Sequence, residues 1–292
     1  MSRGILLLAH GAPDTLEDLG PFLTHIRGGR APSAEVVAET RRRYESFGGR
    51  SPLTEITMAQ ASSLADALAG QWPVLVGMRH APPFIADVLA GAAAQGLDEL
   101  VAVPLAPQYS TLSVGRYRRS VEEALPAGTR VSFVEPWFEH PLLLDAFAER
   151  VRAALARGPR DAVVFTAHSL PVSIVREGDP YPDQVRATAA GVAARLGLDE
   201  LRLAYQSAVP SGEPWLGPPI EETLAVLAGE GRRRVLAVPI GFVSDHAEIL
   251  YDIDVAARGV ARDRGVDLMR SESLNTSPTF IRMLAGLVRA HG

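Results

Sequence analysis

The chain has 292 residues, of which 47% are hydrophobic and 22% are charged, and its formal net charge is −5. Such a composition is typical of a soluble globular protein large enough for two domains, and the acidic balance argues against broad nucleic-acid binding. The sequence has no cysteine, which excludes disulfides, thiolate nucleophiles, and zinc or iron–sulfur sites held by cysteine.

The sequence offers no hydrophobic segment suited to a membrane. It has no run of roughly 18 consecutive apolar residues. Its first stretch, MSRGILLLAH, is too short and too strand-like for a signal peptide. We therefore expect a cytoplasmic protein without stable membrane insertion.

Apolar runs and helix-like patterns alternate through the first half of the chain. The runs predicted as strands are residues 4–9, 74–78, 100–106 and 131–137. The segments predicted as helices are residues 33–44, 57–70, 84–95, 113–125 and 142–157. Residues 21–32, PFLTHIRGGRAP, mix apolar residues with Gly, Pro and Arg, which favours a loop or lip over a regular element.

The second half repeats this alternation. Its predicted strands are residues 162–167, 202–205, 235–240 and 266–270. Its predicted helices are residues 181–196, 220–230 and 278–289, with one more helix beginning near His246. Strands that alternate with helices of this length predict an α/β protein in which helices flank parallel sheets. We expect two domains of similar size, residues 1–150 and 151–292.

Two pairs of segments echo each other between the halves. GILLLAHGAP resembles AVVFTAHSLP, and LVAVPLAPQYS resembles VLAVPIGFVSD. If these are parts of an internal repeat, His10 and His168 occupy equivalent strand ends that face one cleft between two similar domains. Open α/β sheets bind ligands at the carboxyl ends of their strands, so both imidazoles are candidates for a site.

An acidic segment follows the predicted strand at residues 235–240. Gly241 allows a turn, and Ser244 or Asp245 is a suitable N-cap for the next helix. Glu248 and Asp252 are four residues apart, which places both carboxylates on one helix face. Such a row can hold or pass on a divalent cation, and the alternative interpretation is a solvated acidic face. Glu248 is a candidate partner for His168.

Several longer motifs follow one another along nearly the whole chain. They are PFLTHIRGGR, YESFGGRSPLTEIT, LAPQYSTLSVGRY, AHSLP, GDPYPDQ, YQSAVPSGEPWLGP and GFVSDHAEILYD. In this order they resemble the ferrochelatases, which insert ferrous iron into a porphyrin. The resemblance implies two Rossmann-like domains with a porphyrin cleft between them. It also implies that His168 and Glu248 are the catalytic pair and the metal-binding residues at the insertion centre.

The resemblance implies further site residues. Asp252 would extend a metal path outward, although a solvated acid is an equal alternative for it. A further acid often found in the family is Ala256 here, so an outer metal site is in doubt. The segments that match the porphyrin-binding lip contain Arg27, Arg30, Arg43 and Ser51, and the LAPQYS motif contains Tyr109. Guanidinium groups suit propionate carboxylates.

His10 departs from the family pattern, in which Tyr or an apolar residue often precedes this glycine. Three roles remain open for it: an axial ligand to the product iron, a substitute metal donor, or a hydrogen-bonding residue of the cleft. The smaller sirohydrochlorin chelatases have His-Gly at this point. Ala12 also replaces a hydroxyl residue that is frequent in the coproporphyrin enzymes.

The short, arginine-containing lip favours coproporphyrin III as the substrate, with coproheme as the product in heme biosynthesis. The alternatives are a protoporphyrin IX ferrochelatase, a sirohydrochlorin chelatase, and a non-catalytic tetrapyrrole binder. We expect Fe²⁺ as a substrate, with no permanently bound cofactor and no iron–sulfur cluster. A monomer is expected, with transient contact to a downstream coproheme decarboxylase and none to nucleic acid.

Overall fold

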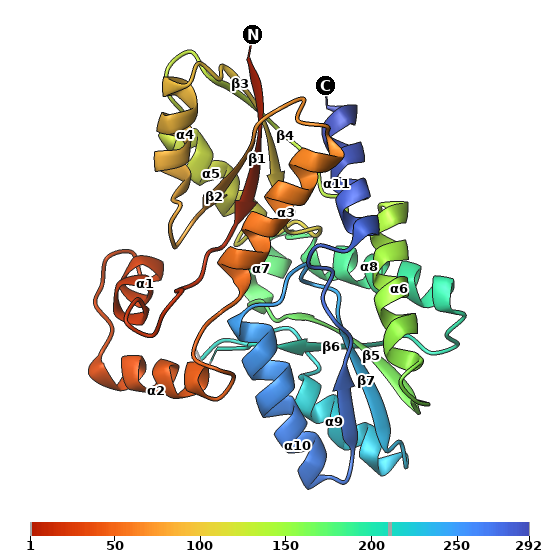
Figure 1. The fold of residues 1–292 in the computed structure, drawn as a ribbon. Helices are drawn as coiled ribbons and strands as arrows, with labels where there is room; N and C mark the ends of the chain where they lie inside the picture. Colours follow the sequence, from red (N-terminus) through yellow and green to blue (C-terminus); the bar gives the residue numbers. More distant parts are fainter. Residues whose placement is uncertain (1, 210–211, 292) are drawn as a thin grey trace. The chain divides into compact units, whose positions relative to one another are not determined.

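The computed structural model describes residues 2–209 and 212–291, which fold into two compact units (Figure 1). The first unit consists of Met1–Ala106, Thr111–Trp137 and Asn275–Gly292. The second unit consists of Pro107–Ser110 and Phe138–Leu274. Each unit contains one four-stranded parallel sheet with helices packed around it.

The sheet of the first unit has the strand order β2-β1-β3-β4. Its strands are β1 (Arg3–Ala9), β2 (Val74–Met78), β3 (Glu99–Pro104) and β4 (Arg130–Phe133). Its helices are α1 (Leu19–Ile26), α2 (Ala34–Glu45), α3 (Leu53–Ala67), α4 (Ile85–Ala94), α5 (Val114–Ala124) and α11 (Pro278–Ala290). β1 lies between β2 and β3 and its apolar run is completely buried from Ile5 to Leu8, as expected for an inner strand of a parallel sheet.

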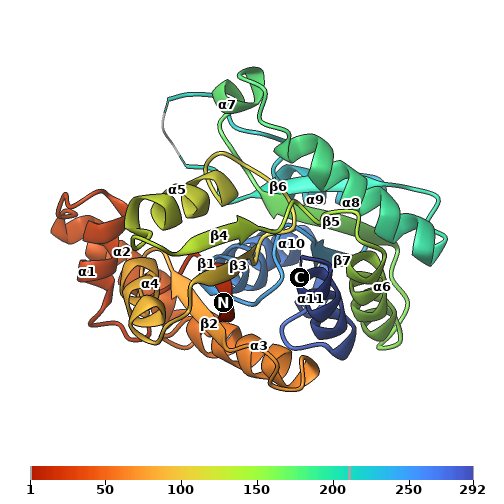
Figure 2. The same cartoon turned by 90° about the horizontal axis from the view of Figure 1, so that it is seen from above.

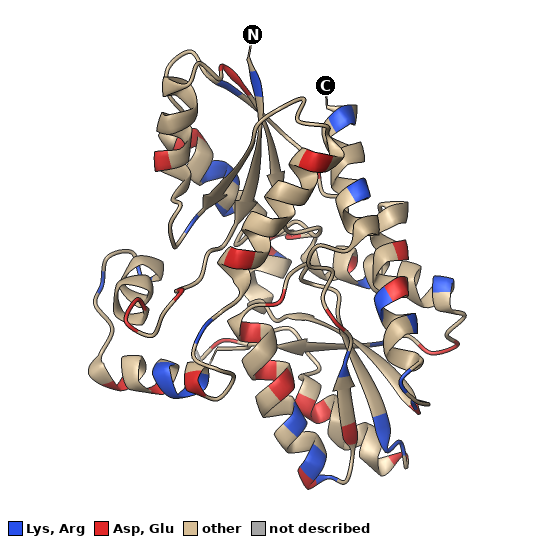
Figure 3. Cartoon of the chain, in the orientation of Figure 1, with Lys and Arg blue, Asp and Glu red and all other residues tan. Residues whose placement is uncertain are grey.

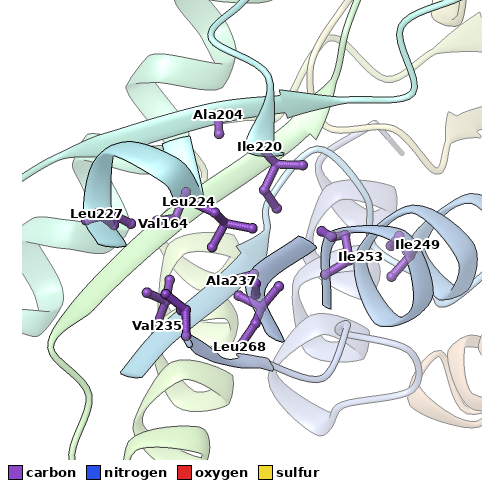
Figure 4. Packing of buried hydrophobic residues seen from close by; sticks show 13 residues of the cluster. Val164, Ala204, Ile220, Leu224, Leu227, Val235, Ala237, Ile249, Ile253 and Leu268 are labelled. Carbon is purple, nitrogen blue, oxygen red and sulfur yellow. The ribbon is translucent and has the colours of Figure 1, made fainter. Parts of the chain in front are cut away.

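The sheet of the second unit has the order β6-β5-β7-β8. Its strands are β5 (Ala162–His168), β6 (Arg202–Gln206), β7 (Arg234–Pro239) and β8 (Asp267–Arg270). Its helices are α6 (Pro141–Leu155), α7 (Val172–Arg176), α8 (Tyr181–Leu196), α9 (Ile220–Gly229), the π-helix η1 (Ile249–Ala257) and α10 (Arg258–Asp263). Figure 4 shows one side of the core, where Leu224 of α9 and Ile253 of η1 pack over the strands.

The two sheets have the same strand order when their strands are numbered within each unit. In both, the first strand of the unit lies between the second and the third. His10 directly follows β1, and His168 is the last residue of β5. The prediction of two similar parallel-sheet units flanked by helices is confirmed, and the common strand order supports an internal repeat.

The packing units do not divide the chain at residue 150. The terminal helix α11 packs against α3 of the first unit, and Gln60 Nε2 donates to the carbonyl of Asn275 at 2.8 Å. α6, predicted as the last helix of the first domain, instead packs beside α8 of the second unit (Figure 2). The apolar face of a helix can pack against elements that are distant in sequence. A single boundary between consecutive elements therefore assigns both α11 and α6 to the wrong unit.

Local structure differs from prediction in the lip. Residues 21–32 were predicted to lack a regular element, but α1 covers Leu19–Ile26. Leu19 and Leu23 are one turn apart and both buried, and Pro21 lies in the first turn, where its missing N–H does no harm. The hydrophobic spacing therefore outweighs the Pro and Gly signals in this segment.

None of the helices in the described ranges is both long enough and apolar enough to cross a membrane.

Candidate active site

His168 lies at the carboxyl end of β5, the edge at which open parallel sheets hold their ligands. Its Nδ1–H donates to the carbonyl oxygen of Ser169. A carbonyl oxygen can only accept, so Nδ1 carries the proton and the lone pair of the neutral ring is on Nε2. The side chain is 27% exposed. His168 therefore presents a basic nitrogen that can accept a proton or bind a metal.

Glu248 lies after β7, the strand that pairs with β5, so the sheet itself brings it toward His168. Its Oε2 is 3.6 Å from His168 Nε2 and 3.6 Å from His246 Nε2. His246 Nδ1–H donates to the carbonyl of Ser244 at 3.1 Å, so its lone pair is also on Nε2. Glu248 Oε2 thus lies near two Nε2 atoms that can only accept while the rings are neutral. A proton on either imidazole Nε2 would provide a donor to this oxygen. In the described part of the chain, no three His, Asp or Glu side chains are grouped to hold a metal ion.

Tyr181 and Phe242 hold the two imidazoles in place. Tyr181 is buried, and its hydroxyl is hydrogen-bonded to the backbone of His168. Burial raises the pKa of Tyr181, so the phenol stays protonated. The Phe242 ring lies 4.3 Å from the His246 ring and 6.4 Å from the His168 ring, measured between centroids. These aromatic contacts restrict the rotation of both imidazoles.

The helix after Glu248 is η1, in which backbone hydrogen bonds run from i to i+5. Asp252 lies in its first turn, and Ser207 donates its hydroxyl to Asp252 Oδ2. Ser207 follows β6 and adopts a φ of 66°, a left-handed conformation that is costly for a residue with a side chain. The carboxylate predicted as a metal relay is therefore tied to the end of β6. Figure 3 shows acidic positions in the first part of the η1–α10 helix and basic positions toward its end.

Asp245 and Asp254 flank this segment and both contact Arg270. Arg270 Nη1 lies 2.8 Å from Asp245 Oδ1, and Arg270 Nη2 lies 2.9 Å from Asp254 Oδ2. Burial lowers the pKa of Arg270, but the hydrogen bonds and charges of Asp254 and Asp245 outweigh it and raise that pKa overall. The guanidinium therefore remains charged.

In the first unit, His10 repeats the geometry of His168. Its Nδ1–H donates to the carbonyl of Gly11 at 2.9 Å, which leaves the lone pair on Nε2. The His10 side chain is exposed. Its ring lies 4.7 Å from that of His80. His10 and His168 therefore have the same tautomer, with the proton on Nδ1 and the basic lone pair on Nε2.

His25 and His80 form a second imidazole pair beside His10. Their Nδ1 atoms are 3.0 Å apart, so one of the two nitrogens donates and the other accepts. The His25 ring also stacks on Phe84, with centroids 5.3 Å apart. Burial, followed by the positive charges of His10, Arg79 and His25, lowers the pKa of His80 to about 3. His80 is therefore neutral near pH 7 and fixes the end of α1 to the loop after β2.

The predicted lip residues occupy different environments within the first unit. Arg27 ends α1 and is exposed. Arg43 Nε lies 3.1 Å from Glu39 Oε1, and the Arg42 and Arg43 guanidinium groups hold the pKa of Glu39 below its usual value. Ser51 is only 3% exposed, and its Oγ accepts from the N–H of Leu53 at 3.4 Å. The hydroxyl thus helps to start α3.

The LAPQYS motif is anchored in the second unit. The backbone N–H of Tyr109 donates to Gln184 Oε1 at 2.6 Å, and Ser110 Oγ donates to Asp179 Oδ2 at 3.0 Å. Gln184 and Asp179 belong to the GDPYPDQ motif. Two motifs that are distant in sequence therefore fix one another. The Tyr109 side chain is partly exposed.

Comparison with known proteins identifies the family. A sequence model of the family described as "Ferrochelatase" matches residues 2–292. The chain belongs to the ferrochelatase family. A ferrochelatase of Deinococcus radiodurans is 41% identical and is aligned over 98% of this chain and 94% of its own. A coproporphyrin III ferrochelatase of Anoxybacillus flavithermus is 39% identical over 99% of this chain and 96% of its own. As a ferrochelatase, the protein is a lyase that inserts a metal ion into a porphyrin.

The fold of this ferrochelatase is shared with solved chelatase structures of similar length. The solved structure of SirB from Bacillus subtilis with Fe³⁺ aligns with a TM-score of 0.61. The alignment covers 99% of this chain and 95% of that one at 15% identity. At this identity the likeness concerns the fold alone, and it agrees with the two parallel-sheet units described above.

Sequence reasoning about this ferrochelatase missed several side chains around Glu248. His246 is only two residues from Glu248, a spacing that does not bring side chains together on a helix. The irregular backbone before η1 makes the contact possible. Ser207 and Arg270 gave no local signal because their partners are 45 residues away and 16 to 25 residues away, respectively. His25 lies in the PFLTHIRGGR motif, but the sequence did not indicate that its ring pairs with His80.

Proposed function

We propose that this ferrochelatase inserts Fe²⁺ into coproporphyrin III, with His168 and Glu248 at the insertion centre. One observation carries the assignment of these residues. The Nε2 lone pair of His168 faces Glu248 Oε2 at 3.6 Å at the carboxyl edge of a parallel sheet. Both side chains are partly exposed, so a substrate can reach them.

The chemistry of metal insertion explains why this pair is suitable. A free-base porphyrin loses two N–H protons when the metal enters its plane, and these protons need acceptors. His168 Nε2 can accept one of them, and the Glu248 carboxylate, whose Oε2 lies 3.6 Å away, can accept the other. Imidazole and carboxylate are also suitable donors for Fe²⁺ before the porphyrin nitrogens replace them. Asp252, four residues after Glu248 in the sequence, would supply the metal from the outer side.

Coproporphyrin III has four carboxylates, and the proposed substrate rests on donors that suit them. Arg27 and Arg30 are exposed, and Arg43 is half exposed on α2. Their guanidinium groups can each bind a carboxylate in a bidentate manner. The relative from Anoxybacillus flavithermus, which carries the coproporphyrin III name, supports the same choice. The relative from Deinococcus radiodurans is named only as a ferrochelatase, so protoporphyrin IX is the competing substrate.

The first experiment tests the site. His168→Ala and Glu248→Gln are each expected to lower iron insertion by at least about 100-fold, while porphyrin binding measured by fluorescence quenching changes little. His291→Gln is the matched control, since His291 is exposed and its Nδ1–H donates to the carbonyl of Leu287 at 3.0 Å. Near-normal turnover of either site variant would remove that residue from the mechanism.

The second experiment tests the substrate. An anaerobic assay with Fe²⁺ compares kcat/KM for coproporphyrin III, protoporphyrin IX and sirohydrochlorin. We expect coproporphyrin III to be the best substrate, and Arg27→Ala and Arg43→Ala to raise its KM more than that of protoporphyrin IX. A preference for either of the other tetrapyrroles refutes the proposed substrate and leaves the site assignment standing.

The remaining parts of the proposal concern cofactor, assembly and location. Fe²⁺ acts as a substrate, no cofactor or iron–sulfur cluster is permanently bound, and the protein works in the cytoplasm as a monomer. Coproheme would pass to a decarboxylase by transient contact. Metal analysis and light scattering of the purified protein test the first two points, and a bound cluster or a stable dimer would contradict them.

A further inference from the structure

Arg270 connects both sides of the acidic segment that carries Glu248 and Asp252. Its Nη1 lies 2.8 Å from Asp245 Oδ1. Its Nε and Nη2 lie 3.0 and 2.9 Å from Asp254 Oδ2, and Nε is also 3.1 Å from Asp254 Oδ1. We call these three side chains the Arg270 clamp. All three are largely buried, with side-chain exposures of 12% for Arg270, 18% for Asp245 and 20% for Asp254.

The clamp is attached to the sheet that also carries His168. Arg270 is the last residue of β8 and pairs with Ala237 of β7. Ala237 pairs on its other side with Val164 of β5, the strand that ends at His168. The next residue, Ser271, donates its N–H to the carbonyl of Ala237 at 2.9 Å. The hydrogen-bonded strands therefore fix the backbone of Arg270 relative to the backbone of His168.

The clamp holds the acidic segment near both of its ends. Asp245 lies before Glu248 in the sequence, and Asp254 lies after Asp252. Ser273 adds a hydrogen bond to Asp245 Oδ1 at 2.8 Å. The helix that carries Glu248 begins at Ala247, directly after the irregular backbone at His246, and becomes the π-helix η1 at Ile249. Glu248 therefore lies in the first turn of this helix. Both ends of the segment that carries Glu248 are therefore bound to Arg270.

We propose that Arg270 is a positioning residue for metal insertion: by binding Asp245 and Asp254 together, it places Glu248 against His168. This inference rests on the proposed roles of His168 and Glu248. A guanidinium is required because it directs several N–H groups in one plane toward two carboxylates, whereas the ammonium of lysine is a single charged point. The same contacts assign Asp245 and Asp254 to the clamp, so the acids left for the metal are Glu248 and Asp252.

The test compares Arg270→Lys with Arg258→Gln. Arg258 also contacts Asp254, at 3.3 Å, but its side chain is 52% exposed and it does not bridge to Asp245. Iron insertion is followed in single turnovers at high enzyme concentration, so that slow variants stay measurable. Porphyrin binding by fluorescence quenching and the thermal unfolding midpoint are measured for each variant. Asp254→Asn opens the clamp from the other side and serves as a second variant should Arg270→Lys not fold.

We expect Arg270→Lys to slow metal insertion by about 10- to 100-fold, the range that a displacement of up to 1 Å produces. Porphyrin affinity should stay within about twofold of wild type, and Arg258→Gln should insert iron at the wild-type rate. In a Glu248→Gln background, Arg270→Lys should add no further loss, because the clamp acts through Glu248.

Three outcomes would overturn the inference, and a fourth would overturn the proposed site on which it rests. A folded Arg270→Lys variant with the wild-type rate would overturn the inference, and so would a loss that multiplies with that of Glu248→Gln. A loss of porphyrin affinity in proportion to the rate would show a general structural role and would also overturn it. If Glu248→Gln itself inserts iron normally, the proposed site fails, and that result is distinct from failure of the clamp.

Discussion

Replacement of Gly241 by alanine should displace His168, because the added methyl group would press against residues that hold His168 in place. Gly241 follows β7, and its N–H donates to the carbonyl of Thr166 at 3.3 Å. A Cβ at this position would lie 2.9 Å from Ala167 Cβ, 3.0 Å from Ala167 Cα and 3.3 Å from the Tyr181 hydroxyl. Ala167 precedes His168, and Tyr181 is hydrogen-bonded to the His168 backbone. Ala167 and Tyr181, which hold His168 in place, would therefore both have to move.

The expected size of the effect follows from these distances. Carbon atoms in contact are ordinarily about 3.5 Å apart or more, so the end of β5 must shift by roughly 0.6 Å. Overpacking of a buried site costs about 1–3 kcal/mol, which corresponds to a fall of about 2–10 °C in the unfolding midpoint of a chain of this size. A shift of this fraction of an ångström should lower kcat by about tenfold.

The assay measures thermal unfolding and iron insertion for Gly241→Ala beside a control. Gly259→Ala is the matched control, because Gly259 lies in α10 and its added Cβ would meet nothing within 4 Å. Helix propensity predicts that it stabilises the protein by about 0.5–1 kcal/mol and leaves kcat unchanged. If Gly241→Ala unfolds at the wild-type temperature and inserts iron at the wild-type rate, the close packing behind His168 does not support the site.

Three further changes test other parts of the structure. If His10 binds the product iron, His10→Phe should alter the axial ligation seen in the absorption or resonance spectrum of the product complex, and identical spectra would rule this role out. Because the pKa of buried His80 is lowered to about 3, the unfolded chain binds more protons than the folded one between that value and about 6.5. Stability should therefore fall as the pH drops through this range, by up to about 1.4 kcal/mol per pH unit, and His80→Gln should reduce that slope in denaturant titrations. Leu224→Ala should lower the free energy of unfolding by about 2–5 kcal/mol, since Leu224 is 1% exposed in the core of the second unit, and a loss below 1 kcal/mol would contradict the packing.

The strand and helix pattern was largely readable from the sequence. The fully apolar run of β1 and the alternation of strands and helices depend on local composition, which determines burial in a parallel sheet. The exceptions included the short helix α7, which was not predicted, and also α1 and the pairing of α11 with α3, which depend on what a helix face packs against. Pro and Gly in the lip were local signals that a buried Leu19–Leu23 pair outweighed.

The two candidate residues of the site were also readable from the sequence, because His168 ends an apolar strand and Glu248 follows the next strand of the sheet. Their separation of 3.6 Å depends on contacts that no local pattern contains. His246 reaches Glu248 only because the backbone before η1 is irregular. Arg270 reaches Asp245 and Asp254 only because β8 pairs with β7 in a particular register.

The sequence by itself therefore determined the fold class, the order of the elements and the residue types available for metal insertion, since these follow from hydrophobic periodicity and motif chemistry. The tertiary structure alone decided the tautomers of His10 and His168, the π-helical form of η1 and the bridge made by Arg270. Each of these depends on hydrogen bonds whose partners are placed by backbone geometry and strand pairing, and the order of residues in the chain does not reveal that placement.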